Sequence, residues 1–208
     1  MSAARSAQKR ELILERALDV FVACGYKGTT TDQLAAAASV SKQTLYKEFG
    51  DKEGVFTALI QFACDRVGDP FAPLTEQMHS ISSAEEALDL LATQFTRSIM
   101  SPRVQQLRRL VIAEAVRFPP LGLLYWESGF LPVLDSVARC LSILDERALL
   151  DIPDARLAAR HFAGMLLWIP SNQTMFAVSM PLDETELAES IAAGSKVFLR
   201  AYRREPTG

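Results

Sequence analysis

Residues 30–49, TTDQLAAAASVSKQTLYKEF, decide the fold. Thr30 can cap a helix, and Gln33 three residues later completes a capping box. Ser41 can then cap a second short helix that follows after only a tight turn. The apolar side chains of both segments recur at helical spacing. The stretch therefore predicts two short helices joined by a turn, the helix-turn-helix pattern.

The second of these helices, residues 42–49, is expected to turn polar side chains outward. Leu45 and Phe49 are four residues apart, so both would face the core of a three-helix head. The remaining side chains carry amide, hydroxyl, amine and phenol groups, which suit base edges and phosphates in a DNA major groove. The predicted DNA contacts are Thr31, Ser41, Lys42, Gln43, Thr44, Tyr46, Lys47 and Lys52. Capped helix pairs also occur in helical proteins that bind no DNA, so geometry alone leaves that alternative open.

Helical periodicity extends over nearly all of the chain, and no strand pattern is present. The sequence therefore predicts an all-α protein with an N-terminal three-helix helix-turn-helix head and a larger helical domain. Caps, glycines and prolines place further helices at about 8–24, 52–68, 84–100, 102–118, 121–147, 155–180 and 184–203. The long segment 121–147 has a possible kink at 129–132, and a loose connection is expected over 69–83.

Composition excludes several classes of protein. The 208 residues are 49% hydrophobic with a net charge of −3, which argues against coating nucleic acid by bulk charge. A small surface that binds phosphates is compatible with this composition, because the first 60 residues hold 8 basic and 7 acidic side chains. Residues 161–182 are uncharged, but their polar centre around Pro170 argues against a membrane span. Three widely spaced cysteines and a polar start without a secretory core predict a cytoplasmic protein that contacts no membrane.

Motifs of enzymes and metal sites are missing from the sequence. It contains no P-loop, GxGxxG, HExxH, GxSxG or EF-hand string, and its two histidines lie far apart. We therefore expect no catalytic residue, no metal and no cofactor, although catalysis by scattered residues is the alternative class.

Residues 9–57 resemble the N-terminal domain of TetR/AcrR-type transcriptional regulators. The resemblance rests on Phe21, Gly25, Tyr26, Gly28, Thr30, Ala35, Val40, Ser41, Leu45, Tyr46, Phe49, Lys52 and Glu53. It implies a homodimer with a DNA-binding head, here residues 1–52, and a domain for effector binding and dimerisation, here 53–208. Ser39 stands where the family usually has glycine, and a left-handed serine there would cost about 1 kcal/mol. Gln43 stands where a small residue is common, so we interpret it as a base contact particular to this operator.

The larger domain carries two sets of candidates. The resemblance implies that the last two helices form the dimer interface, for which the sequence offers Gly164, Leu187, Ile191, Gly194 and Phe198. The same stripe would also suit packing within one chain. Residues that combine apolar surface with polar groups predict a pocket for a hydrophobic or aromatic effector. They are Phe95, Met100, Phe118, Tyr125, Trp126, His161, Met165, Trp168, Asn172 and Met175, any of which could instead fill the core.

Residues 107–122, LRRLVIAEAVRFPPLG, also resemble the effector domain of the AefR-like branch of that family. Together these patterns predict a ligand-responsive regulator, most simply a repressor that binds a palindromic operator as a dimer and is released by a small molecule. The alternatives are an activator of the same fold and a helical small-molecule-binding protein that does not bind DNA.

Overall fold

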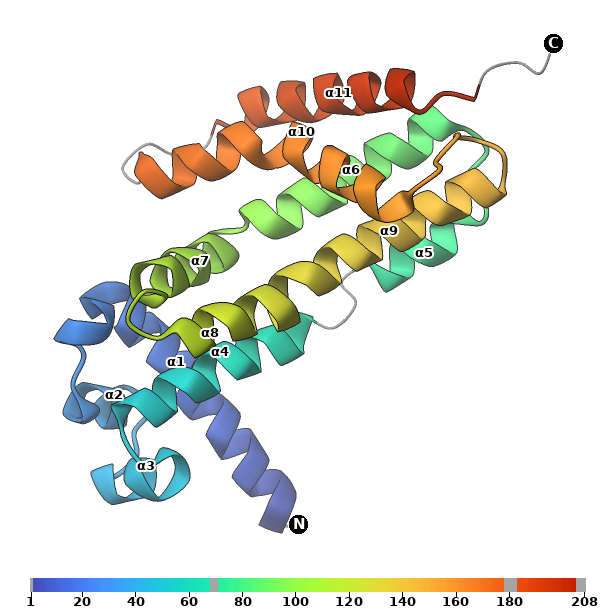
Figure 1. Ribbon diagram of the computed structural model, residues 1–208. Coiled ribbons are helices and arrows are strands. Elements are labelled where there is room, and N and C mark those ends of the chain that lie inside the picture. The colour runs from blue at the N-terminus through green and yellow to red at the C-terminus, as the bar shows by residue number, and fades with distance from the viewer. Residues whose placement is uncertain (1, 68–70, 178–182, 205–208) are drawn as a thin grey trace. The chain divides into compact units, whose positions relative to one another are not determined.

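The computed structural model describes residues 2–67, 71–177 and 183–204, and every regular element in these ranges is a helix (Figure 1). The predicted all-α class is confirmed. Within the same ranges, no helix has both the length and the apolar content needed to cross a bilayer. The chain divides into two compact units, one made of Met1–Gly68 with Gln106–Phe130 and the other of Asp69–Gln105 with Leu131–Gly208.

The first unit begins with the helices that the N-terminal sequence predicts. They are α1 (Ser2–Gly28), α2 (Thr31–Ala37), α3 (Lys42–Phe49) and α4 (Lys52–Val67). Helix α1 packs on α2 and α4, and α3 lies against both α2 and α4 (Figure 1). Phe21, Leu45 and Phe56 are almost completely buried among these helices. The arrangement is the expected three-helix head with α4 as its support.

Helix α1 is interrupted near its end. Gly25 has φ 67° and ψ 169°, a backbone conformation that side chains with a Cβ rarely adopt. The chain then makes one more turn, and the backbone N–H and hydroxyl of Thr29 both donate to the Gly25 carbonyl, at 3.2 and 2.7 Å. The glycine predicted to end the first helix therefore bends it, and the following turn leads into α2.

Three further elements complete the first unit. The end of α7 (Pro102–Glu114) is followed by α8 (Pro119–Leu124) and by η1 (Tyr125–Phe130), a short π-helix. The α4 helix packs on α8 and η1, and apolar side chains from α7 and α8 join the core of the head. Gly129 of η1 is buried, and a Cβ there would lie 3.1 Å from the sulfur of Cys64. The head and this segment thus share one hydrophobic core.

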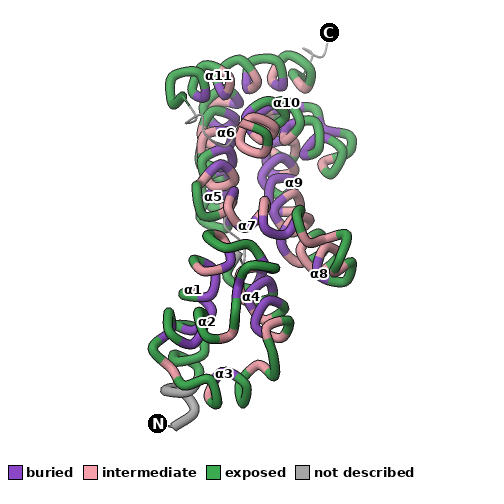
Figure 2. Tube along the Cα trace, turned by 90° about the vertical axis from the view of Figure 1, so that its left-hand side faces the viewer, coloured by how far each residue is buried: buried purple, intermediate pink, exposed green. Residues whose placement is uncertain are grey.

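The second unit is a bundle formed from α5 (Ala72–Met78), α6 (Ala84–Met100), α9 (Leu131–Glu146), α10 (Ala155–Phe176) and α11 (Glu184–Ala201). Helix α10 packs on α9, α11 and α6, and α11 also packs on α6. Buried positions of α6 and α9 form continuous stripes on these helices (Figure 2). Phe95 and Phe162, with ring centroids 6.1 Å apart, connect α6 to α10 in this core.

The structure corrects two details predicted for this part of the chain. The segment expected to be a loose connection contains α5, which buries Leu74 and Met78. The kink expected at 129–132 is a π-helical turn over 125–130, and α9 begins directly after it. Pro170 lies inside α10, as the predicted helix over 155–180 required. The predicted end of that helix near Met180 falls outside the described residues.

The end of α3 fits closely against the first turn of α4. A Cβ built on Gly54 would lie 1.8 Å from the carbonyl oxygen of Phe49, a distance that no real pair of atoms can tolerate. The Gly54 backbone N–H donates to the Asp51 carboxylate at 2.8 Å, which caps this turn. Because the neighbouring atom belongs to the backbone, only glycine at position 54 lets α3 lie where it does.

We therefore expect Gly54→Ala to destabilise the head by about 2 kcal/mol or more, because the methyl group forces α3 away from α4. In an unobstructed helix the same change stabilises by roughly 1 kcal/mol. Thermal unfolding checks the sign, with Gly28→Ala as the control, since a Cβ there meets only the Cys24 Cβ at 3.7 Å. An unchanged or raised melting temperature for Gly54→Ala would contradict the close contact.

Candidate nucleic-acid interface

Both helices of the helix-turn-helix begin with the predicted caps. The Thr30 hydroxyl accepts from the Gln33 backbone N–H at 3.3 Å, and the Gln33 side chain accepts from the Thr30 N–H at 2.8 Å. Ser41 caps α3 in the same way, because its hydroxyl accepts from the Thr44 N–H at 3.1 Å. The capping box and the serine cap are confirmed, so the start of the outward-facing helix α3 is set by local sequence.

The turn between the two helices keeps a left-handed residue. Ser39 has φ 53°, the conformation that favours glycine. Its neighbour Val40 donates from its backbone N–H to the Ala35 carbonyl at 2.9 Å, which closes the turn. The strain of about 1 kcal/mol expected for a serine at this position is therefore present.

Helix α3 presents its polar side chains to solvent. Leu45 is fully buried and Phe49 is half-buried against the core, as predicted. Thr44 is half-buried, because it also contacts the Ser41 hydroxyl at 2.9 Å. The predicted contacts that are exposed are Ser41, Lys42, Gln43, Tyr46 and Lys47, and Glu48 is exposed beside them. Five of the eight predicted DNA contacts thus lie together on one exposed surface of α3 and its cap.

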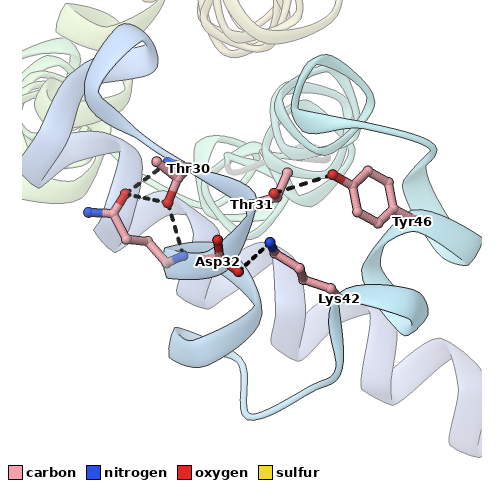
Figure 3. Close-up of polar contacts among 6 residues, drawn as sticks. Thr30, Thr31, Asp32, Lys42 and Tyr46 are labelled. Atoms are coloured by element: carbon pink, nitrogen blue, oxygen red, sulfur yellow. Dashed lines mark hydrogen bonds and ion pairs between the residues drawn. The ribbon is translucent and has the colours of Figure 1, made fainter.

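Two contacts tie this surface to the start of α2 (Figure 3). The ammonium of Lys42 lies 2.6 Å from the Asp32 carboxylate, and the hydroxyls of Thr31 and Tyr46 are 3.4 Å apart. The hydrogen bond to Asp32 raises the pKa of Lys42. Lys42 therefore neutralises an acidic side chain that would otherwise repel phosphates beside α3.

Lys52 has a different environment from the other candidates. Its ammonium donates to the backbone carbonyls of Tyr26 and Thr29, each at 2.8 Å, and lies 4.5 Å from the centre of the Tyr26 ring. The side chain is half-buried. Lys52 thus binds backbone atoms inside the head, and nothing in this geometry tests the phosphate contact that the sequence predicted for it.

Three residues at this surface escaped the sequence analysis. The guanidinium of Arg10 lies 5.1 Å from the centre of the Phe49 ring and adds positive charge at the end of α3. Asp32 forms an ion pair with Lys42, and Gly54 lets the end of α3 pack against α4. A glycine in the first turn of a predicted helix was a signal for Gly54, because glycine is unfavourable there unless space requires it. Arg10 and Phe49 are far apart along the chain, and no local pattern connects them.

The predicted pocket residues are divided between the two units. Phe95 and Met100 are buried in the second unit, whereas Phe118 packs against Tyr26 in the first unit with ring centroids 4.8 Å apart. Trp126 is half exposed and stacks on Phe130 at 4.7 Å, and burial raises the pKa of Tyr125 to about 12. One side of α10 carries His161, Met165, Trp168 and Asn172. All of these except Asn172 are exposed, and the Asn172 side-chain amide donates a hydrogen bond to the Trp168 backbone carbonyl. Met175 is half-buried near the end of that helix.

The residues predicted for the dimer interface lie mostly inside the subunit. Leu187, Ile191 and Phe198 are buried by packing within the second unit. Gly194 allows α11 to approach α10, because a Cβ there would lie 2.8 Å from a methyl group of Leu166. Only Gly164 is open, with nothing within 4 Å of an added Cβ. The stripe on α11 therefore serves intrachain packing, the alternative that the sequence left open.

A buried polar network lies where α6 passes into α7. The Gln105 side chain is 2% exposed, donates to the Ile99 carbonyl at 2.6 Å and accepts from the Thr174 hydroxyl at 2.9 Å. It also lies 3.7 Å from the sulfur of Met100. Through Thr174, these contacts connect the part of α10 that follows Pro170 to the junction between α6 and α7. Nowhere in the described ranges do three or more His, Cys, Asp or Glu side chains gather as a metal site would require.

Comparison with known proteins agrees with this geometry. Residues 13–59 match the family described as "Bacterial regulatory proteins, tetR family", and residues 86–204 match "AefR-like transcriptional repressor, C-terminal domain". A structure described as a TetR-family transcriptional regulator from Mesorhizobium loti MAFF303099 is 38% identical, covers 96% of this chain and 99% of its own, and superposes with a TM-score of 0.90. The structure titled Flavonoid-responsive Regulator FrrA is 27% identical, with 96% and 100% coverage and a TM-score of 0.71.

A curated relative matches the N-terminal part. The uncharacterized HTH-type transcriptional regulator YhgD of Bacillus subtilis (strain 168) is 37% identical over 81 residues, which are 36% of this chain and 42% of that protein. The chain thus aligns with less than half the length of this relative.

Fold and surface define a helix-turn-helix transcriptional regulator, a class of DNA-binding proteins that are not enzymes. The chain belongs to the TetR family, and its larger domain is of the AefR-like type.

Proposed function

We propose that this protein is a transcriptional repressor that binds a palindromic operator as a homodimer in the cytoplasm and is released by a small, largely apolar effector. The observation that carries the proposal is the exposed polar surface of α3, fixed to the core through buried Leu45. In this scheme Gln43 contacts a base edge, and Lys47 contacts a phosphate. The remaining proposed contacts are Thr31, Ser41, Lys42, Thr44 and Tyr46.

Dimerisation is supported by the exposed side of α10. Its apolar side chains recur at helical spacing, and Trp168, Ile169 and Phe176 are 71%, 69% and 85% exposed. Leu157 and Met165 extend the same surface, and the open Gly164 lets another helix approach. An apolar stripe of this length on one helix is typical of a protein interface. Two copies joined here would present two α3 helices to two half-sites of one operator.

The effector and the direction of control are supported by relatives. The larger domain matches a family of repressors, and a 27% identical protein that aligns over its whole length is named as flavonoid-responsive. A flat aromatic compound is therefore the first effector class to consider. An effector acts by binding more tightly to a state with weak DNA affinity than to the state that fits the operator.

The DNA contacts are tested on an operator found by footprinting the purified protein on genomic DNA. Gln43→Ala should relax preference at one base pair per half-site, by about 1–3 kcal/mol. Lys47→Ala should weaken binding to all sequences and reduce the slope of log K against log salt by about 0.9 for each phosphate that is no longer neutralised. If Gln43→Ala weakens every operator variant equally, Gln43 does not distinguish bases. If the wild-type protein prefers no duplex, the proposed function itself is wrong.

The dimer face is tested by Ile169→Asp. A carboxylate placed in an apolar interface is desolvated without a partner, so the dimer dissociation constant should rise by about 100-fold or more. Sedimentation equilibrium measures it. Ile112→Asp is the matched control, because Ile112 is also exposed, at 58%, but lies on α7. Equal dissociation constants for both variants and the wild type would exclude α10 as the interface.

The repressor assignment is tested by transcription in vitro from a promoter that contains the operator. The protein should lower transcript yield, and a panel of flavonoids and other flat aromatic compounds should include one that restores it. The expected coupling is about 5- to 150-fold in operator affinity. A rise in transcript on adding the protein would make it an activator. Restoration while the protein stays bound to the operator would show that the compound acts elsewhere.

A further inference from the structure

In the first unit, two cationic side chains lie against the ring of Tyr26. The Lys52 ammonium donates to the carbonyls of Tyr26 and Thr29 and lies 4.5 Å from the ring centre. The guanidinium of Arg117 lies 5.1 Å from the same ring and 5.1 Å from that of Phe118. Tyr26 itself is only 4% exposed. One buried ring is thus in contact with a cation from α4 and a cation from the α7–α8 turn.

Of the two carbonyls that Lys52 binds, that of Tyr26 lies in the last turn of α1 and that of Thr29 directly follows this helix. The last carbonyls of a helix have no N–H donor in a following turn and carry partial negative charge, and the break at Gly25 brings α1 to its end here. A lysine at such a helix end satisfies them. Thr29 is also 1% exposed and directly precedes Thr30, the cap of α2. By holding the Thr29 carbonyl, Lys52 fixes the point at which α2 begins relative to the first turn of α4.

This position matters for DNA binding because α3 packs against both α2 and α4. If the start of α2 moves relative to α4, the outward surface of α3 moves with it. Tyr26 is also packed on Phe56 of α4, with ring centroids 5.0 Å apart, so the same ring links the end of α1 to the core. A cation over the face of a partly desolvated ring is attracted to the ring and stabilises this packing.

We propose that Lys52 and Arg117 are positioning residues that hold the helix-turn-helix in its DNA-competent arrangement through Tyr26, and that Lys52 does not contact phosphate. Lys52 acts from α4 through the carbonyls of Tyr26 and Thr29. Arg117 acts from the α7–α8 turn through the ring, and it thereby connects a segment outside the head to the start of α2. The proposal depends on DNA binding by α3 but not on the direction of control.

Salt dependence separates positioning from phosphate contact. A lysine that neutralises a phosphate releases counterions, so its removal lowers the slope of log K against log salt. A positioning lysine instead sets the fraction of free protein that is competent to bind. The apparent dissociation constant rises as that fraction falls, while the bound complex keeps all of its phosphate contacts. Affinity then drops at an unchanged salt slope.

The experiment compares Lys52→Met with Lys47→Met on the full-length protein and a footprinted operator. Methionine keeps the unbranched stem of the side chain and removes the charge. Lys52→Met should lower operator affinity by roughly ten-fold or more, the size expected on removing a charge-assisted hydrogen bond, with the salt slope of the wild type. Lys47→Met should lower both affinity and slope. A reduction of slope in Lys52→Met equal to that in Lys47→Met would overturn the proposal.

A second measurement needs no DNA. Hydrogen exchange of the backbone amides in residues 30–49 of the free protein should accelerate in Lys52→Met and, less strongly, in Arg117→Met. It should stay unchanged in Lys47→Met and in Arg103→Met, an exposed arginine in the first turn of α7. Unchanged exchange in Lys52→Met would also overturn the proposal. Because this readout is independent of DNA, it separates failure of the proposal from failure of the proposed function.

A milder variant covers the case in which Lys52→Met does not fold. Glutamine is uncharged but can still donate to one carbonyl, so Lys52→Gln should retain part of the affinity and the full salt slope. If Lys52 contacted phosphate, Lys52→Gln would show a reduced slope as Lys47→Met does. Intermediate exchange at residues 30–49, between that of the wild type and that of Lys52→Met, is the expected accompanying result.

Discussion

The close approach of the Phe49 carbonyl to the α carbon of Gly54 is the constraint on which the DNA-binding surface depends. Helix α3 has only eight residues, too few to be stable alone. Its position comes from its neighbours: Leu45 inserts into the core, and the last turn lies directly on α4 without an intervening side chain. Because the backbone of α3 contacts the backbone of α4 directly, the outer face of α3 is fixed relative to α4. Position 54 must therefore be glycine, since a side chain there would collide with the Phe49 carbonyl.

Local sequence was sufficient for most of the head. The caps at Thr30 and Ser41 and the buried Leu45 follow from spacing within one short stretch, and the left-handed Ser39 was expected from the family resemblance. Longer-range contacts were not predictable in this way. Lys52 is a lysine in the first turn of a helix, and only the fold brings it to carbonyls far earlier in the chain. The same sequence pattern is equally compatible with a phosphate contact, and it does not discriminate between the two.

The larger domain shows why apolar stripes are hard to assign from sequence. The stripe on α11 holds Leu187, Ile191 and Phe198 and is purely apolar at these positions, and the structure buries it within the chain. The stripe on α10 mixes His161 and Asn172 with Met165 and Trp168, and three of these four are exposed. Interfaces between subunits combine apolar and polar side chains more than cores do, because each partner is also exposed to water when free. The mixed composition that suggested an effector pocket therefore also fits a surface that a second subunit covers. The π-helix over 125–130 had no periodic signal, because one inserted residue shifts the pattern by only a fraction of a turn.

Helix α4 is the element that connects these features within the first unit. At its start Lys52 binds the end of α1, in its middle Phe56 packs on Tyr26, and near its end Cys64 lies against Gly129 of the π-helix. Burial raises the pKa of the Cys64 thiol to about 11, so this cysteine is a packing residue and not a reactive thiolate. A π-helical turn is rare in proteins, and the one here contains a buried glycine, Gly129. Gly129 lies so close to Cys64 that a Cβ at this position would be 3.1 Å from the sulfur. Helix α4 thus contacts both this turn and, through Lys52, the residues that precede α2.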